Sequence, residues 1–343
     1  MPVNGTRMHV SLAASQRARE AEIPYLVRLR ERIIGQECIS KITPYLDMID
    51  ANLNPPGRPA GVFMLLGPTG TGKTRTVEAV AEILHHSDRH LLRIDCGEFQ
   101  MEHEVAKLIG APPGYLGHKE TQAVLSQQRI DAATSESSRL SVVLFDEIEK
   151  AAPSMQRILL GILDKGILRI GDNSSVDFEN SLIFFTSNVG YAEIGQMGKA
   201  PGFANTTSPA SLSRMVEQRL KRKFSPEFVN RIDEVLYFEE LTKENLRQIV
   251  DLELTKAEDW LATRWGLDSC ALHFNDSAKD LLVKVGFEAK YGARPLKRAI
   301  THLLWQPLAV LKTSGKITAG LTIHITADGD KLAFSQEKRQ AAT

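Results

Sequence analysis

The sequence has no excess of charge of either sign. Lysine and arginine together number 42, and aspartate and glutamate together also number 42, so the formal net charge is zero. A domain whose main task is to hold nucleic acid normally carries a strongly basic surface. The balance of charge therefore argues against nucleic-acid binding as the dominant function of this chain.

Cysteine is scarce, and long apolar runs are missing. The three cysteines (Cys38, Cys96 and Cys270) lie far apart, are odd in number and lack the paired spacing of a zinc site. This pattern predicts reduced thiols in a cytosolic protein. The first 20 residues have no apolar core of a signal peptide, and no uninterrupted apolar segment is long enough to cross a bilayer. We expect a soluble, cytoplasmic protein.

Residues 61–84, GVFMLLGPTGTGKTRTVEAVAEIL, contain the strongest motif of the chain. An apolar run suited to a buried strand leads into a glycine-rich loop, and apolar residues at helical spacing follow the loop. A strand, a loop and a helix in this order form the context that a nucleotide-binding P-loop requires. A plain glycine- and threonine-rich connection is the alternative, but it does not explain the complete motif.

The residue types of this loop suit phosphate. Glycines let the backbone fold with its N–H groups pointing inward, and the helix that follows adds its positive end. Lys73 can reach the β- and γ-phosphates, and the hydroxyl of Thr74 can coordinate Mg²⁺. The residues predicted to bind nucleotide here are Gly67, Pro68, Thr69, Gly70, Thr71, Gly72, Lys73, Thr74 and Arg75.

Residues 141–150, SVVLFDEIEK, predict a buried strand with Asp146 and Glu147 at its carboxyl end. Open α/β sheets hold their ligands at this edge. Adjacent carboxylates can divide the chemistry, because one can support Mg²⁺ while the next deprotonates the attacking water. The alternative is an acidic helix cap. The P-loop upstream favours catalysis.

Three further positions are open to two interpretations each. Asn188 follows an apolar strand over residues 182–186, where it can cap a turn or hydrogen-bond the attacking water. Arg231 precedes a strand over residues 235–238 and is an ordinary surface residue unless neighbouring subunits meet there. Residues 114–117, Gly-Tyr-Leu-Gly, form either a packed turn or a loop with an apolar tip.

The pattern changes near Glu240, which we take as a domain boundary. We expect an arm or linker over residues 1–25, a large domain over 26–240, a smaller α/β domain over 241–336 and a tail over 337–343. Pro307 is expected to kink or end the helix in which it lies. Residues 127–139 form a polar connection to which no role is assigned.

These motifs together resemble the Clp family of AAA+ unfoldases, and specifically the second ATPase ring of ClpB, ClpA and ClpC. The resemblance covers residues 26–334. It rests on the segments IIGQE, GPTGTGKT, LIGAPPGYLG, VVLFDEIEK, TSN, FSPEFVNRIDEV and YGARPLKRAI. It implies a parallel P-loop sheet flanked by helices, followed by a smaller C-terminal α/β lid domain, with ATP and Mg²⁺ as cofactors.

The resemblance also implies roles for individual residues. Asp146 would support the metal, Glu147 would activate water and Asn188 would sense the γ-phosphate. Arg231 would be an arginine finger that reaches the ATP of an adjacent subunit, and Arg294 a second sensor. The remaining implied roles are an adenine pocket at Ile33 and Ile34 and a polypeptide-gripping pore loop at Tyr115 and Leu116.

The implied activity is ATP hydrolysis in a ring, hexameric in this family, that threads polypeptide through its pore. No adaptor domain, first ring or middle domain precedes residue 26, so we expect a single ring or a truncation.

Gly202 and Phe203 resemble the tripeptide by which related ATPases dock on a ClpP-type protease, but Pro201 replaces the aliphatic residue. Two competing functions are a nucleic-acid-associated switch, suggested by RLKRK at residues 219–223, and a non-hydrolysing scaffold.

Overall fold

A computed structural model describes residues 23–110, 123–191, 209–265, 270–288, 292–317 and 321–338. The side chains of residues 209–214, 265, 270 and 338 are outside this description. The chain divides into two compact units between Phe238 and Glu239, and the loop Pro68–Thr71 groups with the second unit. Each unit is described by itself below.

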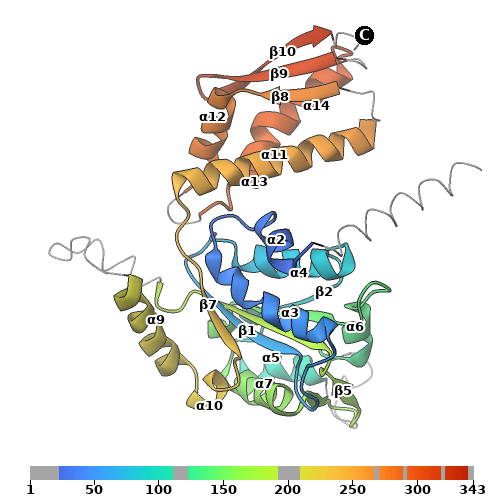
Figure 1. Cartoon of the computed structure of the whole chain (residues 1–343), viewed down its shortest axis with the longest axis vertical. Helices are drawn as coiled ribbons and strands as arrows, with labels where there is room; N and C mark the ends of the chain where they lie inside the picture. Colours follow the sequence, from blue (N-terminus) through green and yellow to red (C-terminus); the bar gives the residue numbers. More distant parts are fainter. Residues whose placement is uncertain are drawn as a thin grey trace, which may run out of the picture. The chain divides into compact units, whose positions relative to one another are not determined.

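The first unit is built on a parallel sheet of five strands in the order β2-β3-β6-β1-β7 (Figure 1). The strands are β1 (Gly61–Leu66), β2 (Leu91–Asp95), β3 (Ser141–Asp146), β6 (Ser181–Ser187) and β7 (Glu234–Tyr237). The central strands are entirely buried, which explains why they are continuous apolar runs rather than alternating ones. The predicted parallel α/β architecture is confirmed.

Successive residues of each central strand enter two different cores. Val62 and Met64 belong to one apolar cluster, whereas Phe63 and Leu65 belong to the other. This separation follows from the pleat, because neighbouring side chains in a strand point to opposite faces of the sheet. Both faces must therefore be covered by helices.

Two groups of helices cover these faces. The core that contains Phe63 includes residues of α2 (Tyr25–Arg30), the 3₁₀ helix η1 (Glu37–Lys41), α3 (Thr43–Asp50) and α4 (Lys73–His85). The core that contains Val62 includes residues of α5 (Glu102–Ile109), α6 (Gln127–Ala132), α7 (Pro153–Lys165), α9 (Pro209–Lys223) and α10 (Pro226–Val229). The sheet is thus enclosed on both sides.

Short elements complete the first unit. The 3₁₀ helices η2 (Cys96–Glu98) and η3 (Ile148–Lys150) directly follow β2 and β3, and β4 (Ile167–Arg169) pairs with β5 (Ser175–Asp177) in an antiparallel hairpin. The side chain of Gln127 accepts a hydrogen bond from the backbone N–H of Asp177 at 2.8 Å. The side chain of Gln127, at the start of the polar segment over residues 127–139, therefore supports this hairpin.

The second unit combines a small sheet with helices. Strand β9 (Leu321–Asp328) lies between β8 (Cys270–Phe274), to which it is parallel, and β10 (Lys331–Lys338), to which it is antiparallel. The helices are α11 (Lys243–Trp265), α12 (Asp276–Gly286), α13 (Leu296–Ile300), the π helix η4 (Thr301–Trp305) and α14 (Gln306–Thr313). Residues from all of these elements share one apolar core.

Of the two outcomes expected at Pro307, a kink or an end of the helix, the end does not occur, because the helix continues past the proline. Residues at both junctions of α13, η4 and α14 have helical backbone angles, and Pro307 lies in the first turn of α14. Proline cannot make the usual bond to the carbonyl four residues earlier, and its ring clashes with that carbonyl. The π turn directly before α14 widens the helix and so accommodates the proline.

No helix within the described ranges is both long and apolar enough to cross a membrane. Cys96 is a free thiol. Cys96 is buried, and burial raises the pKa of its thiol well above the ordinary value.

Candidate nucleotide-binding site

The P-loop connects β1 to α4, as the motif predicts. Gly67 lies against the end of the large unit's last strand, where an added Cβ would be 2.6 Å from Phe238 Cβ. Gly70 and Gly72 have φ angles of 78° and 103°, in the left-handed region that favours glycine. These backbone requirements explain the glycines independently of any ligand.

The loop also fits a phosphate group. No atom of another described part of the chain lies within 4 Å of the place that a Cβ on Gly72 would occupy, so the space beside the loop is open. Helix α4 begins here without a side-chain cap, which leaves its first N–H groups without the usual capping acceptor. The Lys73 ammonium donates to the carbonyl of Gly67 at 2.7 Å and therefore lies along the loop. Donors and positive charge converge where an anion would bind.

Asp146 lies at the end of β3 and is 7% exposed. Its Oδ1 accepts hydrogen bonds from the hydroxyls of Thr186 and, at 3.5 Å, Thr74. Its Oδ2 is paired with the guanidinium of Arg93 on β2. The structure thus places the predicted Mg²⁺-supporting carboxylate beside the P-loop hydroxyl that the sequence assigned to the same metal.

Thr186 and Arg93 were missed at the sequence level. Thr186 is the last but one residue of β6, and its hydroxyl donates to Asp146 while accepting the backbone N–H of Glu147 at 3.0 Å. A buried hydroxyl at a strand end was the available signal for Thr186. Arg93 lies inside a short strand, and the register of β2 with β3 places it beside Leu144, two residues before Asp146. Only this tertiary pairing brings its guanidinium to the Asp146 carboxylate.

Glu147 has a left-handed backbone, with φ 56° and ψ 48°. Such a conformation is uncommon for residues with a Cβ and clusters at functional sites. Its carboxylate forms an ion pair with Lys150, one turn along, and the hydrogen bond from Lys150 to Glu147 raises the pKa of the lysine ammonium. Glu147 is 33% exposed at its side chain, so solvent reaches it.

Asn188 follows β6 directly. Its backbone N–H donates to Glu149 Oε1 at 3.3 Å, and Glu149 Oε2 is buried without a hydrogen-bond partner among the described residues. This contact joins the turn after β3 to the end of β6. The two segments that carry Glu147 and Asn188 are therefore fixed to each other.

Other predicted site residues have partners of their own. Arg231 lies between α10 and β7 and pairs with Asp164 of α7 at 2.8 Å, with both side chains 41% exposed. Arg75 forms a bidentate pair with Glu82, at 2.6 and 2.9 Å, along α4. In the structure, neither side chain is paired with Asp146 or Glu147.

The remaining predicted residues lie apart from this cluster or outside the described residues. Ile33 is buried in the apolar core next to α4, and Ile34 is half-buried. Arg294 is exposed in the turn before α13 of the second unit. Four predicted residues lie outside the described ranges: Tyr115, Leu116, Gly202 and Phe203.

The donor set suits Mg²⁺. Thr74 and Asp146 offer one hydroxyl and one carboxylate, and no group of three or more His, Cys, Asp or Glu among the described residues could hold a metal ion. Mg²⁺ is commonly bound by one or two carboxylates together with substrate phosphates and water, rather than by a complete protein cage.

Comparison with known proteins decides the family. Residues 58–235 match the model of the AAA domain (Cdc48 subfamily). This chain belongs to the AAA family. Residues 241–325 of this AAA protein match a second model, described as the C-terminal, D2-small domain of ClpB protein. The two matches cover the two units in order, and AAA membership implies nucleotide binding.

Named relatives agree with this assignment. The AAA chain is 40% identical over 307 residues to the chaperone protein ClpB of Bdellovibrio bacteriovorus, covering 89% of this chain and 34% of that protein. It is 39% identical over 311 residues to the chloroplastic chaperone protein ClpC3 of Oryza sativa, covering 88% and 32%.

A third relative is the ATP-dependent Clp protease ATP-binding subunit ClpC of Staphylococcus aureus. The identity is 36% over 319 residues, covering 92% of this chain and 38% of that protein. The resemblance to Clp ATPases is therefore confirmed. The chain spans about a third of the length of the curated relatives it matches.

Proposed function

We propose that this AAA protein hydrolyses ATP and uses the reaction to remodel polypeptides. One observation carries the proposal: the P-loop, the carboxylates of β3 and the polar end of β6 meet at the carboxyl edge of the parallel sheet. The hydroxyl of Thr186 joins Asp146 to the backbone of Glu147 there, and the hydroxyl of Thr74 donates to Asp146 directly. Open α/β sheets bind their ligands at this edge.

The P-loop residues have the task of holding the nucleotide. Lys73 would leave the Gly67 carbonyl to pair with the β- and γ-phosphates, and the N–H groups at the start of α4 would donate to phosphate oxygens. Thr74 and Asp146 would hold Mg²⁺, which supplies charge neutralisation between the phosphates when bound. Ile33 and Ile34 would provide the apolar wall for the base.

The residues beyond the P-loop have the task of preparing water. Glu147 would accept a proton from the attacking water, and its left-handed backbone sets its direction. Asn188 would orient the same water or the γ-phosphate. Because Glu149 fixes Asn188 to the turn after β3, a shift at one residue is transmitted to the other.

The proposed activity on polypeptides rests on relatives of the chain rather than on the geometry of the site. Its support is the similarity to proteins named as Clp chaperones. We propose a homo-oligomeric ring, with six copies as in the Clp family, in which Arg231 of one copy completes the site of the next. Arg294 would act as a second sensor, and Tyr115 and Leu116 would grip the substrate. One relative is named as a protease subunit, so docking on a ClpP-type protease stays a further prediction.

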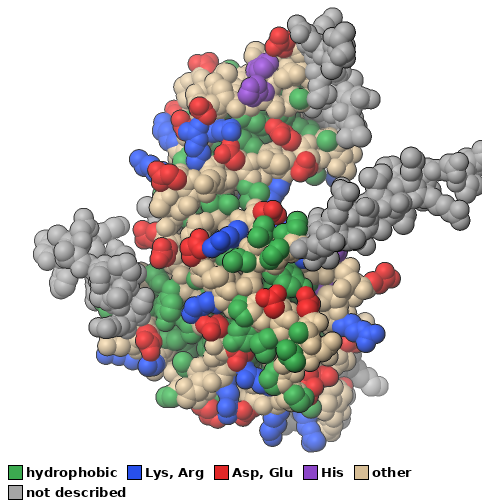
Figure 2. Space-filling model, in the orientation of Figure 1, with side chains coloured by type: hydrophobic (Ala, Val, Ile, Leu, Met, Phe, Trp, Pro, Cys, Tyr) green, Lys and Arg blue, Asp and Glu red, His purple; other side chains and the backbone are tan. Residues whose placement is uncertain are grey.

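The face of the molecule drawn in Figure 2 gives no support to the nucleic-acid switch. In the view of Figure 2, lysine and arginine side chains alternate with aspartate and glutamate and do not gather in one basic patch. Proteins that hold nucleic acid through its backbone concentrate cations on one face.

The direct test is Glu147→Gln. We expect the variant to bind ATP as the parent does and to lose hydrolysis by ~10²-fold or more, because general-base catalysis contributes on this scale. Glu136→Gln, which neutralises an exposed carboxylate elsewhere, is the matched control and should hydrolyse normally. Parental turnover by Glu147→Gln would contradict the role of Glu147.

A second measurement addresses the substrate. We expect an unfolded polypeptide to stimulate hydrolysis by the parent chain and double-stranded DNA to have no effect. Stimulation by DNA alone would instead support the nucleic-acid switch.

A further inference from the structure

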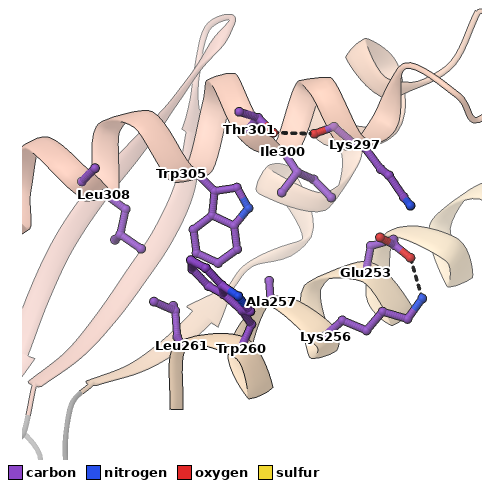
Figure 3. Close-up of a pocket in the computed structure, with 11 residues that line it drawn as sticks. Glu253, Lys256, Ala257, Trp260, Leu261, Lys297, Ile300, Thr301, Trp305 and Leu308 are labelled. Carbon is purple, nitrogen blue, oxygen red and sulfur yellow. Dashed lines mark hydrogen bonds and ion pairs between the residues drawn. The ribbon is translucent and has the colours of Figure 1, made fainter. Parts of the chain in front are cut away.

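A groove of about 860 Å³ lies within the second unit, and the proposed ATPase site does not use it. Its walls are α11 on one side and the continuous helical segment from α13 to α14 on the other (Figure 3). The side chains that line it come from successive turns of both helices. The result is a long trough between two helices, a shape that accepts a third helix.

One end of the groove is aromatic. Trp260 of α11 and Trp305 of η4 meet edge to face, with ring centroids 5.0 Å apart, and Leu308 lies beside them. Trp260 is 50% exposed, although the leucines around it are buried. The guanidinium of Arg264 lies 5.2 Å from the centroid of its ring. A half-exposed tryptophan in a groove is the kind of residue that anchors protein interfaces.

The other end of the groove is charged and has an excess of positive charge. Lys256 pairs with Glu253 at 2.7 Å, whereas Lys297 forms no ion pair with any residue that the structure describes. Figure 3 shows these three side chains on one side of the tryptophan pair and Leu308 on the other. An acidic group on a partner would complement this end.

The spacing of the two ends defines the partner. Lys297 and Trp305 are eight residues apart on one helical segment, which corresponds to roughly 12 Å along a helix. We propose that the groove docks an amphipathic helix of a partner protein, with a bulky apolar side chain against the tryptophans and a carboxylate about two turns away at Lys297. The groove is lined by residues other than those of the proposed nucleotide site, so this proposal does not depend on ATP hydrolysis.

The test uses the full chain and two synthetic helical peptides. Both peptides carry the same leucine and phenylalanine one turn apart. Two helical turns further along, the acidic peptide carries glutamates and the basic peptide carries lysines. The sequence contains three tryptophans, Trp260, Trp265 and Trp305, so intrinsic fluorescence reports on this region. We expect saturable binding of the acidic peptide, at least ~10-fold tighter than binding of the basic peptide.

Variants assign the binding to the groove. Trp260→Ser should weaken the binding of the acidic peptide by ~10-fold or more, which is the effect expected when an interface anchor is removed. Lys297→Glu should reverse the preference so that the basic peptide binds more tightly, a result that loss of folding cannot produce. Arg298→Glu is the matched control, because this neighbouring cation on α13 is exposed and does not line the groove. Arg298→Glu should bind the acidic peptide more tightly than the basic peptide, as the parent does.

Three results would overturn the proposal. The first is that neither peptide binds the folded chain, and the second is that both bind equally. The third is that Lys297→Glu still binds the acidic peptide more tightly than the basic one. A second copy is the competing occupant. It would be indicated by a concentration-dependent particle mass that Trp260→Ser abolishes, and that outcome would also contradict a partner helix.

Discussion

Thr186 is the residue on which Asp146 and Glu147, the two carboxylates proposed to act in hydrolysis, depend most directly. The residue is 1% exposed, and its hydroxyl donates to Asp146 and accepts the N–H of Glu147. A buried polar group that loses its partner costs about 1–3 kcal/mol. One side chain therefore supports both the carboxylate proposed to hold Mg²⁺ and the backbone of the proposed base.

Replacing Thr186 tests this link. Thr186→Val keeps the shape and removes the hydroxyl, so we expect the free energy of unfolding to fall by about 1–3 kcal/mol and ATP turnover to fall with it. Thr186→Ser is the control, because it keeps the hydroxyl. Chemical denaturation and steady-state hydrolysis report the two effects. Parental behaviour of Thr186→Val would mean that the Thr186 hydroxyl does not position Glu147.

His85 gives the first unit a defined response to acid. The residue is 5% exposed at the end of α4, its Nδ1 contacts the Ser135 hydroxyl at 2.9 Å, and burial, followed by the charges of His90 and His86, lowers its pKa to about 4. An unfolded histidine has a pKa near 6.5. Because the folded pKa is depressed, the contribution of neutral His85 to the free energy of unfolding is fully present above pH ~6.5. This contribution is lost as the pH falls toward 4.

We expect this loss to appear as a decrease of Tm between pH 6.5 and 4. His85→Asn cannot take up a proton there, so its Tm should vary less over the same range even if it is lower throughout. Differential scanning calorimetry of both proteins measures the difference. Identical pH profiles would show that His85 is not the group responsible.

At the scale of elements, the end of β1 is fixed by close packing against the residue after β7. Gly67 approaches Phe238 so closely that an added Cβ would lie 2.9 Å from its carbonyl oxygen as well as 2.6 Å from its Cβ. Backbone cannot move aside as a flexible side chain can. The position of the P-loop is therefore set by two parallel strands before any nucleotide binds.

Gly67→Ala should disturb this packing. We expect destabilisation of about 1–3 kcal/mol, the usual range for overpacking, together with weaker nucleotide binding. Gly161→Ala is the matched control, because no atom lies within 4 Å of its added Cβ and alanine favours the helix α7. Thermal unfolding and binding of a fluorescent nucleotide test both statements. An unchanged Tm for Gly67→Ala would contradict the close packing.

The elements also show what sequence patterns can and cannot predict. The buried strands and the P-loop helix were predicted because apolar runs and helical spacing are local signals. The hairpin of β4 and β5 was not, because three-residue strands are too short to show a period. The ion pairs of Arg93 with Asp146 and of Arg231 with Asp164 join residues far apart in sequence. Only the tertiary arrangement reveals such contacts.

At the scale of the whole molecule, the account depends on a site that two copies share. Arg231 pairs with Asp164 on its own chain, half exposed, and its Nε is buried without a partner among the described residues. We propose that in the ring this guanidinium contacts the nucleotide of the neighbouring copy. Arginine fingers raise phosphoryl-transfer rates by about 10³–10⁵.

Mixing two inactive variants tests this claim most directly. Glu147→Gln lacks the base and Arg231→Ala lacks the finger, so neither should hydrolyse ATP alone. In mixed rings some interfaces combine Glu147 from one copy with Arg231 from the other, and we predict that ATP turnover returns. The double variant mixed with Glu147→Gln is the control and should stay inactive. Mixed particles, verified by native mass spectrometry, that fail to recover any turnover would contradict the shared site.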